Sequence, residues 1–209
     1  MKTEVPRNAM VLAAATAVLK SLLDNGLVTY GLSGSLGGEV VTSVLSPDRI
    51  TVQSDSHSQL NLFLYQITQK GLGTVSRYAS GDDVPRTDLV VFELLYLVTA
   101  YGAQDYHTEI LLGYALDQLN AHPCLSGSEV RTTLEAFAPN GNHHQLSPPL
   151  MALGQSDIAG RFATIRIAPQ ITTYQDMQNL WSSFQTPYRP SATYKVTLEL
   201  SAFVTPATS

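Results

Sequence analysis

The residues best suited to chemistry lie in His107-Thr-Glu109, with a single cysteine, Cys124, further along the chain. Zinc deaminases use an H-x-E pair as a metal ligand and a general acid/base, but they also need Pro-Cys-x-x-Cys. Here Leu-Ser-Gly-Ser follows Pro123-Cys124, so the second thiolate ligand is missing. The sequence therefore predicts no catalytic residue and no metal site. A zinc- or thiol-dependent enzyme that uses His107, Glu109 and Cys124 is the alternative.

The other motifs give no catalytic or cofactor site. The glycines between Gly31 and Gly38 lack the Gly-Lys-Ser/Thr of a phosphate-binding loop. His143-His144 stand beside asparagines, without further ligands placed by the sequence. A lone cysteine is typically a small buried apolar residue, and this is what we expect of Cys124. No cofactor is expected.

Composition narrows the classes of partner. The chain has 209 residues, of which 44% are hydrophobic and only 14% charged, and its net charge is −5. A typical soluble domain is about one quarter charged, so much of the surface is uncharged, which hints at assembly with other chains. Lysine and arginine form no cluster, and the electrostatic requirement for binding nucleic acid is not met.

The first helix predicted from the pattern covers about Ala9 to Asn25, with apolar residues at spacings of three and four. Its start resembles the apolar core of a secretion signal. The pattern continues through Lys20 and Asp24 to Gly26, which favours a core helix that ends at a glycine. No segment has the roughly 18 uninterrupted apolar residues of a membrane span, and no membrane partner is expected.

Alternation and helical spacing predict the remaining elements. Strands are expected over 39–45, 49–52, 60–67, 89–98, 161–168 and 192–203, and further helices over 103–122, from Ser126, and over 173–185. Strand 60–67 is apolar on both sides and should be central, whereas 192–203 alternates and should be antiparallel or at an edge. The fold class is α+β: a single mixed β-sheet with helices packed on it.

We expect one domain over residues 1–205, with a tail over 206–209. Flexible loops are predicted at about 31–38, 68–88 and 138–157, where glycine, proline, serine and asparagine are frequent. The first two loops could become ordered against neighbouring subunits.

An interaction surface is suggested near the C-terminus. Trp181 and Phe184 have helical spacing and should belong to the core. Tyr188-Arg189 lies between Pro187 and Pro190, which fix the backbone. Tyrosine and arginine on a rigid turn are typical interface anchors; alternatively, Arg189 caps the preceding helix.

Several segments in order resemble a known family. They are Ser46-Pro-Asp-Arg-Ile50, Gln59-Leu-Asn-Leu-Phe-Leu-Tyr65, Leu95-Tyr-Leu-Val-Thr-Ala-Tyr-Gly-Ala103, His107-Thr-Glu-Ile-Leu-Leu-Gly-Tyr-Ala115, and Leu180-Trp181 before Tyr188-Arg-Pro-Ser-Ala-Thr-Tyr194. Together they resemble the tail-terminator, or cap, proteins of extracellular contractile injection systems of the antifeeding-prophage type. The resemblance covers most of the chain.

The resemblance implies a structural subunit, phage tail-terminator-like in fold and without enzyme activity. Six copies would form a ring that caps the inner tube and the contractile sheath, assembled in the cytoplasm and retained in the phage-tail-like particle. Its partners would be itself, sheath subunits and inner-tube subunits. An assembly adaptor or chaperone absent from the mature particle is a second alternative. The motif positions carried over as interface candidates are Tyr65, Tyr101, Asp105, His107, Tyr188, Arg189 and Tyr194.

Overall fold

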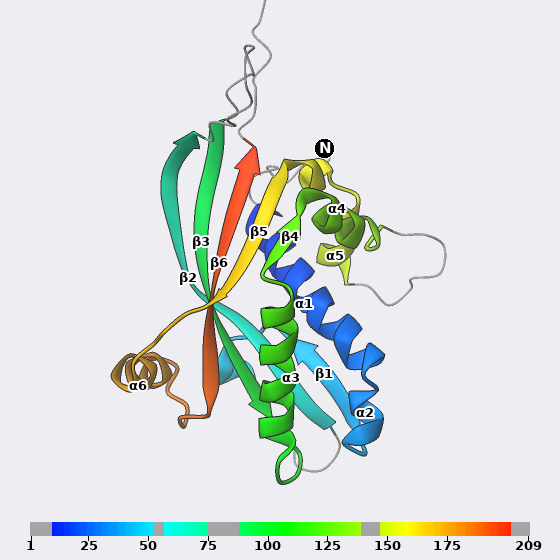
Figure 1. The fold of residues 1–209 in the computed structure, drawn as a ribbon. Coiled ribbons are helices and arrows are strands. Elements are labelled where there is room, and N and C mark those ends of the chain that lie inside the picture. The colour runs from blue at the N-terminus through cyan, green and yellow to red at the C-terminus, as the bar shows by residue number, and fades with distance from the viewer. Residues whose placement is uncertain (1–9, 52–56, 75–87, 139–146, 202–209) are drawn as a thin grey trace, which may run out of the picture.

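The protein is described by a computed structural model over residues 10–51, 57–74, 88–138 and 147–201. At its centre lies a six-stranded sheet with the strand order β1-β2-β3-β6-β5-β4 (Figure 1). β1 and β2 are parallel, and every other neighbouring pair is antiparallel. The sheet is therefore mixed, as predicted. The strands are β1 (Glu39–Ser43), β2 (His57–Thr74), β3 (Asp88–Tyr101), β4 (Cys124–Ser126), β5 (Phe162–Pro169) and β6 (Ser191–Ser201).

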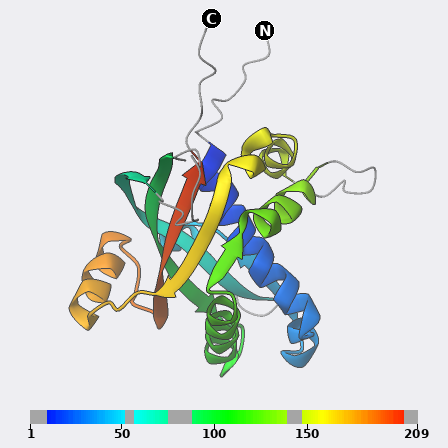
Figure 2. The same ribbon diagram turned by 45° about the horizontal axis from the view of Figure 1, so that its top comes forward.

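The helices lie on both faces of the sheet, unequally. One helix, α6, lies apart from the others on the opposite face, as Figures 1 and 2 show. The predicted α+β class is confirmed. The elements are the helices α1 (Val11–Thr29), α2 (Leu32–Ser35), α3 (His107–Ala121), α4 (Gly127–Glu135), α5 (Pro148–Gly154) and α6 (Tyr174–Ser183), with 3-10 turns η2 (Pro47–Arg49) and η3 (Asp157–Arg161).

Alternation along the long strands separates two apolar clusters. In β3, Tyr96 and Val98 belong to the main core, which also contains residues of α1, α3, α4 and α5. Leu97, between them, packs on the other face against Met177 and Trp181 of α6. Successive side chains of a strand point to opposite faces, so β3 supplies both clusters at once.

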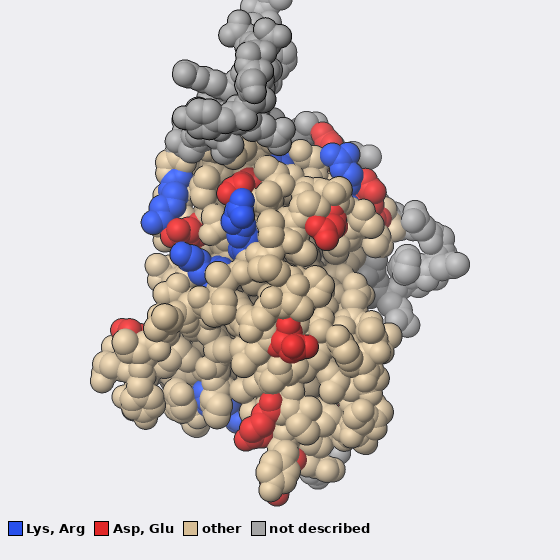
Figure 3. All heavy atoms as spheres, in the orientation of Figure 1, with Lys and Arg blue, Asp and Glu red and all other residues tan. Residues whose placement is uncertain are grey.

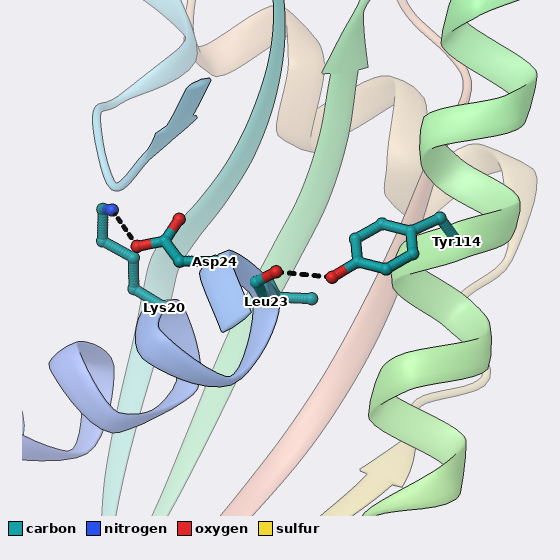
Figure 4. Close-up of polar contacts among 4 residues, drawn as sticks. All are labelled: Lys20, Leu23, Asp24 and Tyr114. Atoms are coloured by element: carbon teal, nitrogen blue, oxygen red, sulfur yellow. Dashed lines mark hydrogen bonds and ion pairs between the residues drawn. The ribbon is translucent and has the colours of Figure 1, made fainter. Parts of the chain in front are cut away.

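The main core is closed by the approach of α3 to α1. Gly26 of α1 is buried, and a Cβ atom there would overlap the hydroxyl of Tyr114. That hydroxyl donates a hydrogen bond to the Leu23 carbonyl, while Lys20 and Asp24 form an ion pair at 2.5 Å one turn along α1 (Figure 4). The glycine thus allows the two helices to meet where a side-chain hydroxyl satisfies a backbone carbonyl.

By length and hydropathy α1 could also cross a membrane, since its mean hydropathy is 1.4 over an 18-residue window. Half of that window is buried inside the protein. Ala14, Leu19 and Leu23 are fully enclosed by the main core. This packing agrees with the core helix predicted from the sequence.

The helix predicted from Ser126 begins there through a capping box. The Ser126 hydroxyl accepts the Glu129 amide at 3.3 Å, and the Glu129 carboxylate accepts the Ser126 amide at 2.7 Å. These two bonds satisfy donors that a helix start leaves without partners.

Several predicted loops contain regular structure. Within 31–38 the chain forms the short helix α2, and Leu36 is buried. Residues 68–74 continue β2, because β3 offers a pairing partner beyond the predicted strand end. Residues 148–154 form α5, which begins with prolines at its first turn, where they are tolerated. Residues 75–87, 139–146 and the predicted tail lie outside the described part of the chain.

One strand prediction is also corrected, and another is decided between its two alternatives. Arg49 ends a 3-10 turn and starts no strand, because Pro47 at its beginning favours turn geometry. Of the two alternatives predicted for 192–203, antiparallel pairing is the one observed, because β6 lies inside the sheet between β3 and β5. Its alternating burial reflects one face in the main core and the other toward α6.

Candidate functional site

The second face of the sheet carries α6 and a group of aromatic side chains. Thr173 caps the helix by accepting the Asp176 amide at 3.2 Å. Met177 and Trp181 lie one turn apart and are buried against Leu97 of β3. The helix is therefore fixed by a narrow apolar contact, and most of its remaining residues are exposed. Trp181 is a core residue, as predicted.

Edge-to-face ring contacts extend from Trp181 to the surface. Its ring centroid lies 6.1 Å from Phe184 and 6.1 Å from Tyr188. Tyr188 in turn lies 5.9 Å from Tyr174. Such arrangements add to the stability gained from burial. The outer members of this group form what we call the aromatic patch: Tyr174 and Tyr188 are 66% and 47% exposed. Ile171, three residues before Tyr174 in the chain, is 94% exposed.

The connector after α6 is held by a chain of hydrogen bonds. The Trp181 indole Nε1 donates to the Ser191 hydroxyl at 3.2 Å, and Ser191 donates to the Arg189 carbonyl at 3.1 Å. The backbone that carries Tyr188 and Arg189 is therefore tied to the buried end of α6.

The guanidinium of Arg189 makes a cation–π contact and no polar one within the described chain. Its guanidinium carbon lies 4.8 Å from the centroid of the Tyr101 ring, and the side chain is half-buried. Among the described residues, its guanidinium has no hydrogen bond or ion pair. In the described chain, Arg189 therefore does not cap the C-terminal end of α6. A half-buried guanidinium with free donors is able to form charge-assisted hydrogen bonds with a carboxylate of another molecule.

A hollow of about 570 Å³ lies near the C-terminal end of α6, lined by Ser46, Asp48, Ser183, Phe184, Gln185 and Thr186. Its only titratable lining residue is Asp48. Gln185 has a positive φ of 55°, which turns the chain sharply out of the helix. The hollow places the Ser46-Pro-Asp48 turn beside the end of α6 but assembles no acid–base pair.

Burial raises the pKa of Tyr65 and Tyr101, which lie beneath the surface around α6. For Tyr65 desolvation is the main cause, and the Asp176 carboxylate adds to it. For Tyr101 desolvation outweighs the attraction of Arg189 for the ionised form. Both phenols are therefore neutral at physiological pH and act as packing groups.

The structure brings together four of the predicted interface residues. Tyr65 packs against the apolar cluster of α6, Arg189 lies over Tyr101, and Tyr188 is part of the aromatic patch. Ile171 and Tyr174 were missed by sequence reasoning. The available signal was two apolar side chains flanking the Thr173 cap, outside the buried stripe of the helix.

The other three candidates lie elsewhere. Tyr194 is 2% exposed in the main core, and its hydroxyl donates to Asn120 at 3.1 Å, so it supports the fold and offers no surface. Asp105 is exposed just before α3. His107 is buried at the start of α3, and its Nδ1 lies 3.0 Å from the Ser58 hydroxyl, which also accepts the Ala103 amide.

The enzyme alternative requires residues that the fold keeps apart. His107 begins α3, whereas Cys124 follows its end. Fifteen helical residues span about 22 Å at 1.5 Å each. Cys124 is exposed, contrary to the expectation of a buried residue, because it lies on the outer side of the short strand β4. Within the described ranges, no three His, Cys, Asp or Glu side chains could hold a metal together.

The charged side chains are unevenly spread. Figure 3 shows most of them gathered over β2, β3, β5, β6 and α4, whereas the surface between α6 and α3 carries fewer. Two ion pairs lie in the charged half: Lys70 with Glu93 at 3.2 Å and Arg166 with Glu199 at 3.3 Å. The aromatic patch thus adjoins a surface that requires little desolvation of charge to be covered.

The described residues form an α+β protein with one mixed sheet and with exposed apolar and aromatic side chains around α6. The chain matches the family described as the Pvc16 N-terminal domain over residues 14–207, and it belongs to this family. The match confirms the resemblance found in the sequence. No curated protein matches the chain.

Two solved structures are similar in fold. One is the sheath/tube terminator of PVC, an extracellular contractile injection system, in its extended state: 21% identity, TM-score 0.44, over 87% of this chain and 60% of that one. The other is the tube-terminating cap of the anti-feeding prophage: 16% identity, TM-score 0.40, over 73% and 48%. The chain therefore spans less than two thirds of either structure, and the family assignment depends on the family match.

Proposed function

We propose that this chain is a non-enzymatic structural subunit that caps the inner tube and contractile sheath of a phage-tail-like injection particle. The observation that carries the proposal is its membership, over nearly its whole length, of the Pvc16 N-terminal domain family. The similar structures are a sheath/tube terminator and a tube-terminating cap, which agrees with this role.

The subunit acts by covering the growing ends of the tube and sheath, so that no further subunit is added. We propose that six copies close into a ring through heterologous contacts, since such contacts end growth only when the rotation closes. The ring forms in the cytoplasm and stays on the finished particle.

Two contact regions are proposed for these interfaces. The first is the aromatic patch with Arg189, whose composition is that of an interface anchor. The second is the turn that carries Asp105 before α3. Tyr65, Tyr101 and His107 are mostly enclosed and act by positioning these regions.

Electron microscopy of particles made with and without the gene tests the proposal. We expect tubes of variable length, or unstable sheaths, in its absence, and a six-fold ring at the particle end when it is present. Particles of normal length and stability without the gene would exclude the capping role. Mass spectrometry of purified particles separates a cap, which stays, from an assembly chaperone, which does not.

A further inference from the structure

The two edges of the sheet are protected to very different degrees. At one edge β4 is only three residues long, and beyond it the Ile167 amide donates to the Pro123 carbonyl at 2.8 Å. At the other edge β1 pairs with β2 only from His57 to Asn61. In Figure 1 the upper part of β2 is the outermost strand on its side of the sheet.

A buried asparagine ends the pairing of β1 with β2. Asn61 is fully buried, and its amide group bonds both the Leu45 amide and the Leu45 carbonyl at 3.0 Å. Ser43 also donates to its Oδ1 at 2.6 Å. These bonds replace the ladder that β1 would have continued, so the chain leaves β2 at this point. From residue 62 on, no described segment pairs with the outer side of β2.

Register shifts divide this free edge. The pairing with β3 is irregular between Leu64 and Gln66 and between Lys70 and Leu72. The longest uninterrupted run on the free part of β2 is therefore Gln66–Lys70, which we call the open run. Proteins usually block such an edge with lysines, prolines, bulges or a covering segment. Here the open run has one lysine, and Lys70 is already paired with Glu93.

Exposed apolar side chains accompany the open edge. Val44 and Leu45, where β1 departs, are 43% and 39% exposed, and Ile67 within the open run is 49% exposed. An extended chain alongside β2 would satisfy its free amides and carbonyls and cover these side chains. Backbone pairing of this kind supplies affinity, and alternate side chains supply specificity.

We infer that the open run, Gln66–Lys70, receives an extended strand from a different subunit of the particle. The strand is uncharged where it faces Ile67 and has apolar residues at alternate positions, because the edge offers no free charge for a charged partner. The same edge of a second copy is not the occupant, because an edge pairs with itself only in a two-fold arrangement, which neighbours within a ring of six do not have. The inference rests on the proposed function for the identity of the partner.

Amide hydrogen exchange measured on the isolated chain and on assembled particles tests the inference. We expect the amides of residues 62–71 that point away from β3 to exchange at least tenfold more slowly in the particle. Unchanged exchange there, in particles that contain the chain and have normal length, overturns the inference and leaves the capping role intact. Protection in the isolated chain that grows with concentration would assign the edge to a second copy instead.

A matched pair of variants completes the test. Ile67→Lys puts a charge into the open run, and Ile110→Lys puts the same charge on α3 at a similar exposure of 44%. Both should keep the thermal midpoint of the parent. We expect Ile67→Lys to lower incorporation into particles at least fivefold and Ile110→Lys to leave it unchanged. Equal incorporation of both variants overturns the inference, and absence of the parent chain from particles overturns both proposals.

Discussion

Arg189 lies over the face of Tyr101, with 4.8 Å between its guanidinium carbon and the ring centroid. The two residues come from the connector after α6 and from the end of β3, so the contact joins the C-terminal part of the chain to the long central strand. The guanidinium lies over the ring, while its donors have no partner in the described structure. This geometry fixes the orientation of the cation and leaves its donors free among the described residues.

Arg189→Ala should leave the chain folded and reduce assembly, because the interface loses a positioned donor group. A tenfold or larger loss of incorporation into particles is expected, in the range of a hot-spot residue. Arg189→Lys should not restore it, since an ammonium lacks the planar stack. Quantitative mass spectrometry measures incorporation. The exposed Arg131 of α4 provides a control, and equal effects of Arg131→Ala and Arg189→Ala would contradict the prediction.

The aromatic patch should contribute to binding but little to stability. Tyr174 is 66% exposed, so Tyr174→Ala is expected to change the free energy of unfolding by less than about 1 kcal/mol. We expect it to weaken assembly measurably, because tyrosines are common anchors. Denaturant unfolding and particle incorporation, measured together, separate the effects. If the loss of stability by itself accounts for the loss of assembly, the Tyr174 side chain only supports α6 and is no binding anchor.

Trp181 should be the main residue that holds α6 to the sheet. It is 2% exposed and is the only tryptophan of the chain, so its fluorescence reports directly on this contact. Trp181→Ala is expected to reduce the free energy of unfolding by about 3–5 kcal/mol. Trp181→Phe removes the hydrogen bond to Ser191 but keeps an aromatic ring, so it should reduce the free energy of unfolding by less. Urea unfolding followed by circular dichroism compares them, and similar losses in both variants would argue against this packing role.

Because Tyr114 is partly buried, the stability of the folded chain should depend on pH in the alkaline range. Burial raises its pKa above the ordinary 10.0, and the nearby Asp24 carboxylate adds to the shift. Above pH 10 the unfolded chain loses a proton that the folded chain keeps, so stability should fall as the pH rises. Tyr114→Phe should lower stability at neutral pH by about 1 kcal/mol, through loss of the Leu23 bond. It should also flatten the alkaline decline, which thermal melts between pH 8 and about 11 can follow.

His107 should affect folding and not turnover. Its ring bonds Ser58 in a buried position, and His107→Ala is expected to reduce the free energy of unfolding by about 1–3 kcal/mol, since it leaves a polar group without its partner. Metal analysis of the purified chain should find no stoichiometric zinc. Zinc at one per chain, lost in the His107→Ala variant, would revive the enzyme alternative.

The sequence alone determined the elements whose signals are local. The capping box of Ser126 and Glu129, the alternation of 192–203 and the helical spacing of Met177 and Trp181 depend only on residues near in sequence, and each was predicted correctly. The missing second cysteine, which argued against a zinc site, can also be read from neighbouring residues. The family resemblance likewise depended on motifs that can be read in order along the chain.

Only the tertiary structure decided which surfaces are open. Tyr194 and Tyr188 looked alike as candidates, yet one is enclosed by α3 and the other is exposed beside α6, because the two faces of one sheet are covered unequally. The pattern of the last strand allowed either an antiparallel or an edge position, and the structure places it inside the sheet, since strand order depends on contacts between residues far apart in sequence. Pairing with β3 likewise extended β2 through residues whose composition predicted a loop. Local patterns fix the elements, but long-range packing decides which side of each element a partner can reach.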